Sequence, residues 1–216
     1  MQKTKTVSTE LPYSPLHIRY NRIIKRTFDL VISAVALCTL FPVICLVVGI
    51  IIKLTSPGPI FFIQKRTGKD GKDFLCYKFR SMVMNQDADK VQATADDPRK
   101  TPFGNFIRNT SIDEIPQLIN VFLGDMSLIG PRPHMVKHTE MYSKLIANYM
   151  DRHAVKPGIT GWAQVTGLRG ETKELYLMER RVEADIWYIQ NWSLLLDLKI
   201  VFKTISTILS GDKNAY

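Results

Sequence analysis

The sequence predicts an α+β, mainly helical fold with one membrane-embedded helix near the N-terminus. An uncharged apolar run covers residues 30–52, aromatic and β-favouring residues fill 60–64 and 74–79 on either side of a glycine-containing turn, and an amphipathic pattern with lysines covers 194–209. The apolar run predicts a membrane helix and the paired short runs predict a small β-hairpin. The last stretch predicts an amphipathic helix, either at the membrane interface or against the core.

The chain of 216 residues carries a formal net charge of +9 and three cysteines. Its length suits one domain with appendages and a substantial core. The charge indicates an anionic partner, for which nucleic acid, anionic lipid and phosphorylated substrates all qualify. We expect no nucleic-acid partner, because the basic residues flank a lipid-seeking helix and not an aromatic base-stacking face. The cysteines lack metal-ligand spacing and are interpreted as reduced packing residues.

The sequence divides into three parts. Residues 1–18 form a polar arm, 19–55 the membrane helix, and 56–216 the remaining domain. A cleaved signal peptide is not expected, because the apolar run starts late and lacks a small-residue cleavage site. At about 1.5 Å per residue the run makes roughly 34 Å of helix, enough to cross a bilayer.

Whether the helix crosses the membrane is left open by the sequence. Pro42 lies at the middle of the run, where it removes a helix hydrogen bond and predicts a kink. Lys and Arg residues flank the run on both sides, which favours both ends on the cytoplasmic side and a re-entrant helix over a spanning one. The basic flanks are Arg19, Arg22, Lys25 and Arg26 before the run, and Lys53, Lys65, Arg66 and Lys69 after it.

The segment 108–133 is where we expect the chemistry. It sets two adjacent carboxylates, Asp113 and Glu114, between Arg108 and Arg132. A proline within the first turn predicts a helix that begins near Asp113, runs to about residue 123 and stops at a glycine. Backbone N–H groups at such a helix end suit a phosphate, and paired carboxylates suit a divalent cation.

A structural interpretation of the same pair also exists. Ser111 and Glu114 fit a capping box, in which the serine caps the helix and the glutamate reaches back. Acidic residues are common in a first helical turn without any catalytic task.

Further candidate anion ligands lie outside this segment. Lys78 and Arg80 leave the second hairpin strand, where a solvated edge is the alternative interpretation. The run from Lys156 to Trp162 combines a proline, two glycines and a hydroxyl, which can aim N–H groups at an anion; a plain tight turn is the simpler explanation. The candidate residues in this run are Lys156, Gly158, Thr160 and Gly161.

Five segments, taken in order, resemble the monotopic phosphoglycosyl transferases, the bacterial sugar transferase family. The resemblance extends from about residue 20 to residue 208. The segments are the Pro42-containing apolar helix, Tyr77-Lys-Phe-Arg-Ser-Met82, Asp113-Glu114-x-Pro-Gln-Leu118, Gly124-Asp-Met-Ser-Leu-Ile-Gly-Pro-Arg-Pro133 and Lys156-Pro-Gly-Ile-Thr-Gly-Trp-Ala-Gln-Val165.

This resemblance implies a monotopic membrane enzyme with a Pro-kinked re-entrant helix and a catalytic domain, 56–216, on the cytoplasmic face of the bacterial inner membrane. Such an enzyme moves a sugar 1-phosphate from a UDP-sugar onto undecaprenyl phosphate, releasing UMP, at the start of exopolysaccharide or lipopolysaccharide synthesis. Asp113 then takes the role of nucleophile forming a phosphoryl-aspartate, and Glu114, with Asp113, that of a Mg²⁺ ligand. Membrane lipids are further expected partners.

The physical case for a carboxylate nucleophile stands beside the resemblance. Two anions, a diphosphate and a lipid phosphate, repel each other, and two separate displacements let each enter alone. Mg²⁺ and nearby cations would neutralise charge on the transferring phosphoryl group and favour ionised Asp113. Gly167-Leu-Arg-Gly-Glu-Thr172 resembles the glucose-1-phosphate-transferring branch, which implies UDP-glucose as donor.

Two other functions fit the same residues. A hydrolase would transfer the sugar phosphate to water, with the carboxylates serving only the metal. A membrane-docked scaffold of a polysaccharide assembly would need no chemistry at all. The sequence leaves open the sugar, the oligomeric state, the pathway, and whether the chain is a short family member or part of a longer one.

Overall fold

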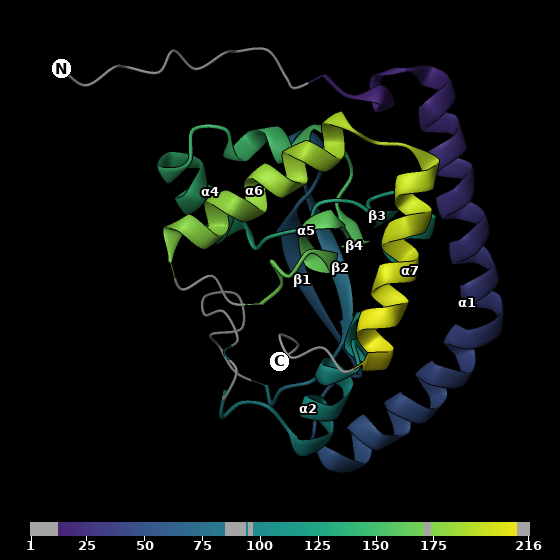
Figure 1. Ribbon diagram of the computed structural model, residues 1–216. Helices are drawn as coiled ribbons and strands as arrows, with labels where there is room; N and C mark the ends of the chain where they lie inside the picture. Colours follow the sequence, from purple (N-terminus) through teal and green to yellow (C-terminus); the bar gives the residue numbers. More distant parts are fainter. Residues whose placement is uncertain (1–12, 85–93, 95–96, 171–173, 211–216) are drawn as a thin grey trace.

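The computed structural model describes residues 13–84, 94, 97–170 and 174–210 (Figure 1). Helices dominate, and the strands form two two-stranded sheets. The α-helices are α1 (Arg19–Thr55), α2 (Pro102–Asn109), α3 (Gln117–Leu123), α4 (Val136–Leu145), α5 (Trp162–Val165), α6 (Leu175–Gln190) and α7 (Leu194–Ser210). The strands are β1 (Phe61–Thr67), β2 (Asp73–Phe79), β3 (Ser127–Ile129) and β4 (Gly158–Thr160), and the 3-10 helices are η1 (Pro15–His17), η2 (Lys69–Gly71), η3 (Ile112–Glu114) and η4 (Tyr149–Ala154). The expectation of a mainly helical fold with a small hairpin and a long apolar N-terminal helix is confirmed.

Helix α1 is continuous through Pro42 and follows a curved path along one side of the molecule (Figure 1). Among the described residues it is the one helix long and apolar enough to cross a membrane, and only 17% of its most apolar window is buried. Such an exposed apolar surface favours contact with lipid over contact with water. Near its proline, Phe41 stacks on Phe79 of β2 with ring centroids 6.4 Å apart, which fastens the middle of α1 to the hairpin.

The first turns of α1 carry charges that the fold uses internally. Lys25 Nζ lies 2.7 Å from Asp197 Oδ2 of α7, and Arg26 donates to the carbonyls of Val121 and Phe122 at the end of α3. Asp29 accepts from the Ser127 hydroxyl. Two cations of the basic flank therefore also have structural tasks, because they neutralise a buried carboxylate and cap a helix end.

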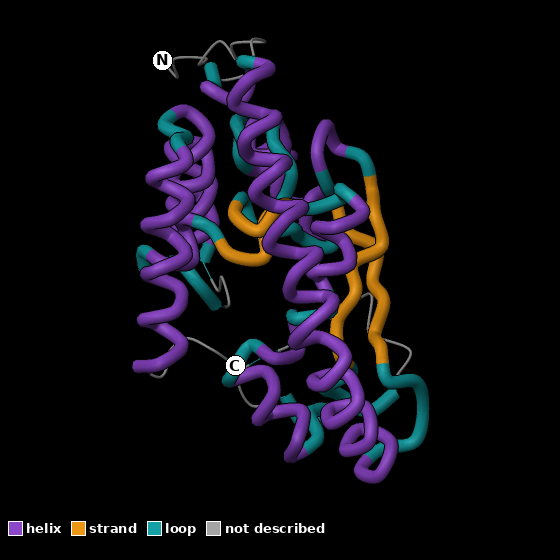
Figure 2. Tube along the Cα trace, turned by 90° about the vertical axis from the view of Figure 1, so that its right-hand side faces the viewer, coloured by secondary structure: helices purple, strands orange, loops and turns teal. Residues whose placement is uncertain are grey.

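The hairpin prediction is confirmed. Strands β1 and β2 pair antiparallel around η2, with Phe61 opposite Phe79. Figure 2 shows them as long orange strands beside the helices, with the short β3–β4 pair nearer the middle. The first strand runs past the predicted end at Gln64 to Thr67, because its pairing continues as far as the turn.

The β3–β4 pair is parallel and was not predicted. Ser127 faces Gly158 and Ile129 faces Thr160 in its register. Glycines let the two backbones meet, since a Cβ built at Gly158 would lie 2.1 Å from the nitrogen of Gly130. The largest core cluster packs around this pair and contains Leu16, Ile129, Val155, Tyr188, Ile189, Trp192 and Ile200.

Helix α7 has two different faces. Asp197 and Ile200 are completely buried, whereas Leu195, Phe202 and Ile205 are exposed. The amphipathic pattern of 194–209 therefore packs on the core and still leaves apolar side chains outside. Residues 1–12 of the expected polar arm lie outside the described residues, and the Ser14 hydroxyl fastens the rest of the arm by donating to the Ile189 carbonyl.

Candidate active site

Asp113 and Glu114 lie on the short turn η3 between α2 and α3, and both are buried, with 6% of each residue exposed. The helix begins at Gln117 and not near Asp113, so the expected helix start is wrong by about one turn. Pro116 occupies the N-cap position, and Gly124, with φ of 97°, ends the helix as predicted. A tight 3-10 turn therefore presents the carboxylates ahead of the helix.

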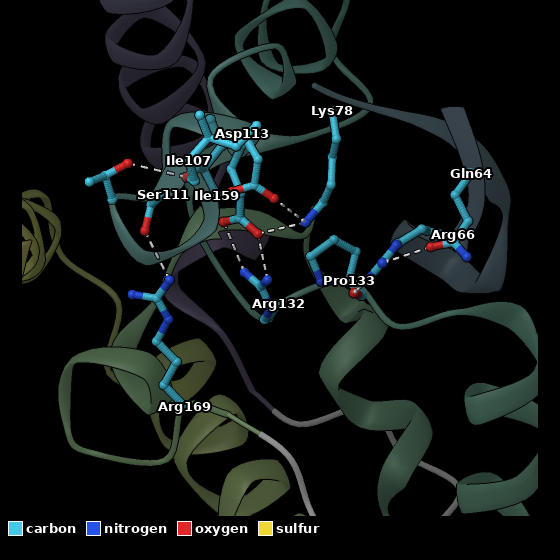
Figure 3. A network of polar contacts seen from close by, with 12 residues as sticks. Gln64, Arg66, Lys78, Ile107, Ser111, Asp113, Arg132, Pro133, Ile159 and Arg169 are labelled. Atoms are coloured by element: carbon cyan, nitrogen blue, oxygen red, sulfur yellow. Dashed lines mark hydrogen bonds and ion pairs between the residues drawn. The ribbon is translucent and has the colours of Figure 1, made fainter. Parts of the chain in front are cut away.

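The capping-box interpretation is also wrong. The backbone of Ser111 is left-handed, with φ of 58°, and its side chain makes no capping bond. Its hydroxyl accepts instead from Arg169 Nη2 at 2.9 Å (Figure 3). The serine thus links the carboxylate turn to the segment that follows α5.

Glu114 is the centre of an ion cluster. Lys78 Nζ donates to its Oε1 at 2.7 Å, and Arg132 donates to Oε2 at 3.1 Å and to Oε1 at 2.5 Å. Lys78 also lies 3.9 Å from Asp113 Oδ2, so its ammonium faces both carboxylates (Figure 3). The three elements that carry these side chains are β2, η3 and the loop after β3.

The two carboxyl groups have opposite pKa shifts. Burial alone would raise the pKa of Glu114, but the bonded Arg132 and Lys78 outweigh burial and hold this pKa well below its ordinary value. Burial raises the pKa of Asp113, and the charge of Glu114 raises it further, against the opposing charges of Lys78 and Arg108. The nearby cations favour ionised Asp113, as expected, but the pKa is still raised because desolvation is the larger effect.

A buried amide holds Lys78 opposite the carboxylates. The Asn120 side chain of α3 donates to the Leu75 carbonyl at 2.6 Å and accepts from the Tyr77 N–H at 3.0 Å. Asn120 is completely buried. These bonds dock α3 on the edge of β2 and thereby fix Lys78 relative to η3.

Two arginines hold the loop that carries Arg132. Arg152 Nη2 donates to the Arg132 carbonyl at 2.9 Å, and Arg66 Nη1 donates to the Pro133 carbonyl at 2.7 Å. Arg152 is only 2% exposed and pairs with Asp185 of α6 at 2.6 Å. The loop therefore takes its position from a buried ion pair as well as from its two prolines.

Some of the predicted ligands lie elsewhere. The Arg80 guanidinium donates to the carbonyls of Ser56, Pro57 and Pro59, so it stabilises the turn after α1 and does not face the carboxylate pair. Arg80 follows the last residue of β2, where the strand alternation that would place it beside Lys78 has ended. Lys156 lies near Gly124, at the far end of α3 from Asp113.

The predicted anion-binding run is mostly structural. The Gly158 N–H donates to the Pro131 carbonyl at 2.9 Å, so this donor is not available to an anion. A Cβ at Gly161 would lie 2.2 Å from the Gly130 oxygen, so close packing of the backbone explains why the second glycine of the run is needed. Thr160 bonds to Thr204 of α7 and lines the same cavity as Glu114. Arg108, in the last turn of α2, acts on Asp113 through its charge.

The carboxylates fit Mg²⁺ by donor chemistry. Magnesium sites commonly use one or two carboxylates, with substrate phosphates and water as the other ligands. No group of three or more His, Cys, Asp or Glu side chains placed for a metal occurs among the described residues. Both Glu114 oxygens already bond to Lys78 and Arg132, so an ion held here would share Glu114 with these cations and take its other ligands from Asp113 and the phosphates of a substrate.

Sequence reasoning missed the residues that support the site. Arg169 was noticed only as part of a motif, although its bond to Ser111 brings it beside the carboxylate turn. Arg152 and Asp185 are far apart in the sequence, and no local sequence motif marks their ion pair. The sequence indicates such a buried ion pair only by a charged residue at a position where the helical pattern places apolar residues, as for Asp185 within α6.

Comparisons with known proteins show the family to which the chain belongs. A family model described as bacterial sugar transferase matches residues 20–211. A protein of Escherichia coli (strain K12), "UDP-glucose:undecaprenyl-phosphate glucose-1-phosphate transferase", is 54% identical over 186 residues, which cover 86% of this chain and 40% of that protein. A protein of the same name from Xanthomonas campestris pv. campestris is 48% identical over 199 residues, covering 91% of this chain and 41% of its own length.

A third relative carries a different sugar in its name. The "UDP-N-acetylgalactosamine-undecaprenyl-phosphate N-acetylgalactosaminephosphotransferase" of Aeromonas hydrophila is 47% identical over 189 residues, 87% of this chain and 44% of that protein. The chain thus spans about two fifths of the length of these relatives. The family model covers most of the chain, and the relatives are far more than 30% identical to it. The chain belongs to the bacterial sugar transferase family.

Proposed function

We propose that the protein transfers a sugar 1-phosphate from a UDP-sugar to undecaprenyl phosphate, with Asp113 as the nucleophile. The observation that carries this proposal is the buried Asp113–Glu114 pair, one carboxylate held by Lys78 and Arg132 and the other left with a raised pKa. Family membership and the names of the relatives support the reaction.

The reaction takes two displacements at one phosphorus atom. A carboxylate oxygen of Asp113 attacks the phosphorus that bears the sugar, and the bond to the bridging oxygen breaks, so UMP leaves. The enzyme then carries the sugar phosphate as a mixed anhydride with Asp113. A phosphate oxygen of undecaprenyl phosphate attacks the same phosphorus, the anhydride bond breaks, and the free carboxylate returns with the lipid diphosphate sugar as product.

The cations of the site have distinct tasks in this scheme. Lys78 faces both carboxylates and is placed to neutralise charge on the transferring group, while Arg132 offers the planar guanidinium that suits phosphate oxygens. Mg²⁺, with Asp113 and Glu114 as its protein ligands, would supply further charge neutralisation. Arg108 adds positive potential around Asp113.

UDP-glucose is the first choice of donor. The motif 167–172 resembles the glucose-transferring branch, and four relatives above 45% identity are named for glucose. The relative named for N-acetylgalactosamine makes that sugar the second choice.

We infer a re-entrant α1 and a catalytic part on the cytoplasmic face of the inner membrane. In support, both halves of α1 pack on the same body. Lys25 bonds to Asp197 in the first half, whereas Val48 and Ile52 in the second half join a core cluster with Phe79 and Ile107. A straight spanning helix would carry one of these halves across the bilayer, away from its partners.

The direct test is incubation of the full chain with undecaprenyl phosphate, Mg²⁺ and a panel of UDP-sugars. We expect UMP release together with sugar on the extracted lipid, strongest for UDP-glucose. Asp113→Asn should abolish both, and mass spectrometry of enzyme treated with donor alone should find the sugar phosphate on the peptide that bears Asp113. Free sugar phosphate without lipid product would show a hydrolase, and unchanged lipid product in Asp113→Asn would end the nucleophile assignment.

A further inference from the structure

A cavity of about 390 Å³ lies beside the carboxylate turn, and the scheme above gives it no role. Residues of α1, α3, β3, β4, α5 and α7 line it, and most of them are aliphatic or aromatic. Its size lies in the range of sites for small ligands.

One end of the cavity is polar. Glu114, Ser111 and Arg169 line it there, and Arg169 donates to the Ser111 hydroxyl at 2.9 Å. Figure 3 shows Arg169 reaching Ser111 from the opposite side to Lys78, with Ile159 nearby. An anionic head group at this end would meet a guanidinium and lie next to the reacting carboxylates.

The other walls belong to helices with apolar outer surfaces. Phe28 and Ile32 of α1 line the cavity, as do Val201, Ile205 and Ile208 of α7. Ile32, Ile205 and Ile208 are also partly exposed outside, at 44%, 50% and 44%. The cavity is therefore bordered by the surfaces that suit lipid, and a long apolar chain can leave it without crossing polar surface.

We propose that this cavity between α1 and α7 binds the phosphate-proximal isoprene units of the lipid acceptor, with Arg169 contacting the acceptor phosphate. The volume is too small for an entire undecaprenyl chain, so the remainder stays in the bilayer. The inference rests on the proposed function and adds to it the place where the second substrate enters.

The sugar of the donor is the competing occupant. Gln164 lines the cavity, and its Oε1 is buried without a hydrogen-bond partner in the part of the chain that the structure describes. A sugar hydroxyl could donate to this oxygen. The mostly aliphatic lining favours the isoprenoid, because each buried CH₂ group gains about 0.8 kcal/mol whereas a sugar would lose its hydration.

Filling the cavity from α7 tests the proposal. Ile205→Trp places an indole in the cavity wall at a half-exposed position, where the helix tolerates a larger side chain. Ser206→Trp is the matched control, since Ser206 is the next residue of α7, is exposed and does not line the cavity. Ile208→Trp is a second cavity variant, in case the first fails to fold.

The full chain in lipid nanodiscs is assayed with UDP-glucose and a graded mole fraction of undecaprenyl phosphate. We expect Ile205→Trp and Ile208→Trp to raise the KM for undecaprenyl phosphate by about tenfold or more, the usual scale for steric change in an apolar pocket. Their KM for UDP-glucose should stay unchanged, and Ser206→Trp should behave as the unmodified chain.

The outcomes separate this inference from the proposed function. Unchanged acceptor KM in both cavity variants overturns the inference while the reaction itself stands. A raised KM for UDP-glucose with an unchanged acceptor KM also overturns it and assigns the cavity to the donor sugar. If the unmodified chain makes no lipid-linked sugar, the proposed function fails first.

Discussion

At the scale of the residue, the proposed nucleophile Asp113 would have to lose its proton before attacking phosphorus, and burial opposes that loss. Its pKa is raised above the ordinary value of 3.8, so the ionised fraction falls at a higher pH than for an exposed aspartate. We expect the rate of UMP release with UDP-glucose alone to fall, as the pH is lowered, with a midpoint above 3.8. The first turnover is the measurement of choice, because the lipid phosphate, which titrates itself, is absent.

Circular dichroism at each pH is the control, since loss of the fold would mimic loss of the nucleophile. Glu114 keeps a depressed pKa through its bonds to Arg132 and Lys78 and stays ionised over the same range. A midpoint at or below 3.8 would contradict the assignment of a desolvated Asp113.

Arg132 and Arg152 make a contrasting pair of mutations. The side chain of Arg132 is 27% exposed and bonds to the buried Glu114, so Arg132→Ala should lower kcat by about 10²–10³ and cost less unfolding free energy than Arg152→Ala, because Lys78 still neutralises Glu114. Arg152→Ala leaves Asp185 buried without its partner and should cost about 3–5 kcal/mol of unfolding free energy. Urea unfolding and steady-state kinetics on both variants measure the two effects; near-normal turnover in Arg132→Ala would remove this arginine from the site.

At the scale of the element, the β3–β4 pair depends on glycine for its close backbone contact. Gly158→Ala would force a methyl group to 2.1 Å from the Gly130 nitrogen and should destabilise the protein by about 1–3 kcal/mol. Gly167→Ala is the control: among the described residues no atom beyond its chain neighbours lies within 4 Å of its Cβ position, and its φ of 88° is unfavourable by about 1 kcal/mol. Equal thermal shifts in the two variants would argue against the packing role of Gly158.

The same elements show which structure local sequence can predict. The hairpin was found because both strands and their turn are adjacent and aromatic-rich. Strands β3 and β4 have three residues each and pair across a long stretch of chain, so no local pattern marks them. Lys78 lies within the predicted second strand and reaches Glu114, whereas Arg80 lies just past the strand end and turns to the carbonyls after α1.

For the candidate site, the sequence predicts the carboxylate pair and not its surroundings. Asp113 and Glu114 lie in one short motif, so their proximity followed directly. The raised pKa of Asp113 could not be predicted, because it depends on how deeply tertiary packing buries η3. Arg169 reaches Ser111 from 58 residues away, and only the fold brings the two together.

At the scale of the whole molecule, the direction of α1 decides how the protein meets the membrane. Epitope tags at residue 5 and residue 70 of the chain should both be inaccessible from outside intact cells, because both halves of the helix pack on one body. A tag on a periplasmic protein is the positive control for access. Opposite accessibility of the two tags would show a spanning helix.

The ion pair between Lys25 and Asp197 has a consequence for biogenesis. Asp197 also accepts hydrogen bonds from Tyr188 and Trp192 and has no exposed surface, so it is the centre of a buried polar network. During translation α1 leaves the ribosome long before Asp197 is made. Until then Lys25 has no Asp197 to pair with, and we expect its ammonium to stay near the lipid head groups. We therefore expect the packing of α1 on the rest of the protein to finish late in maturation, after α7 has been made.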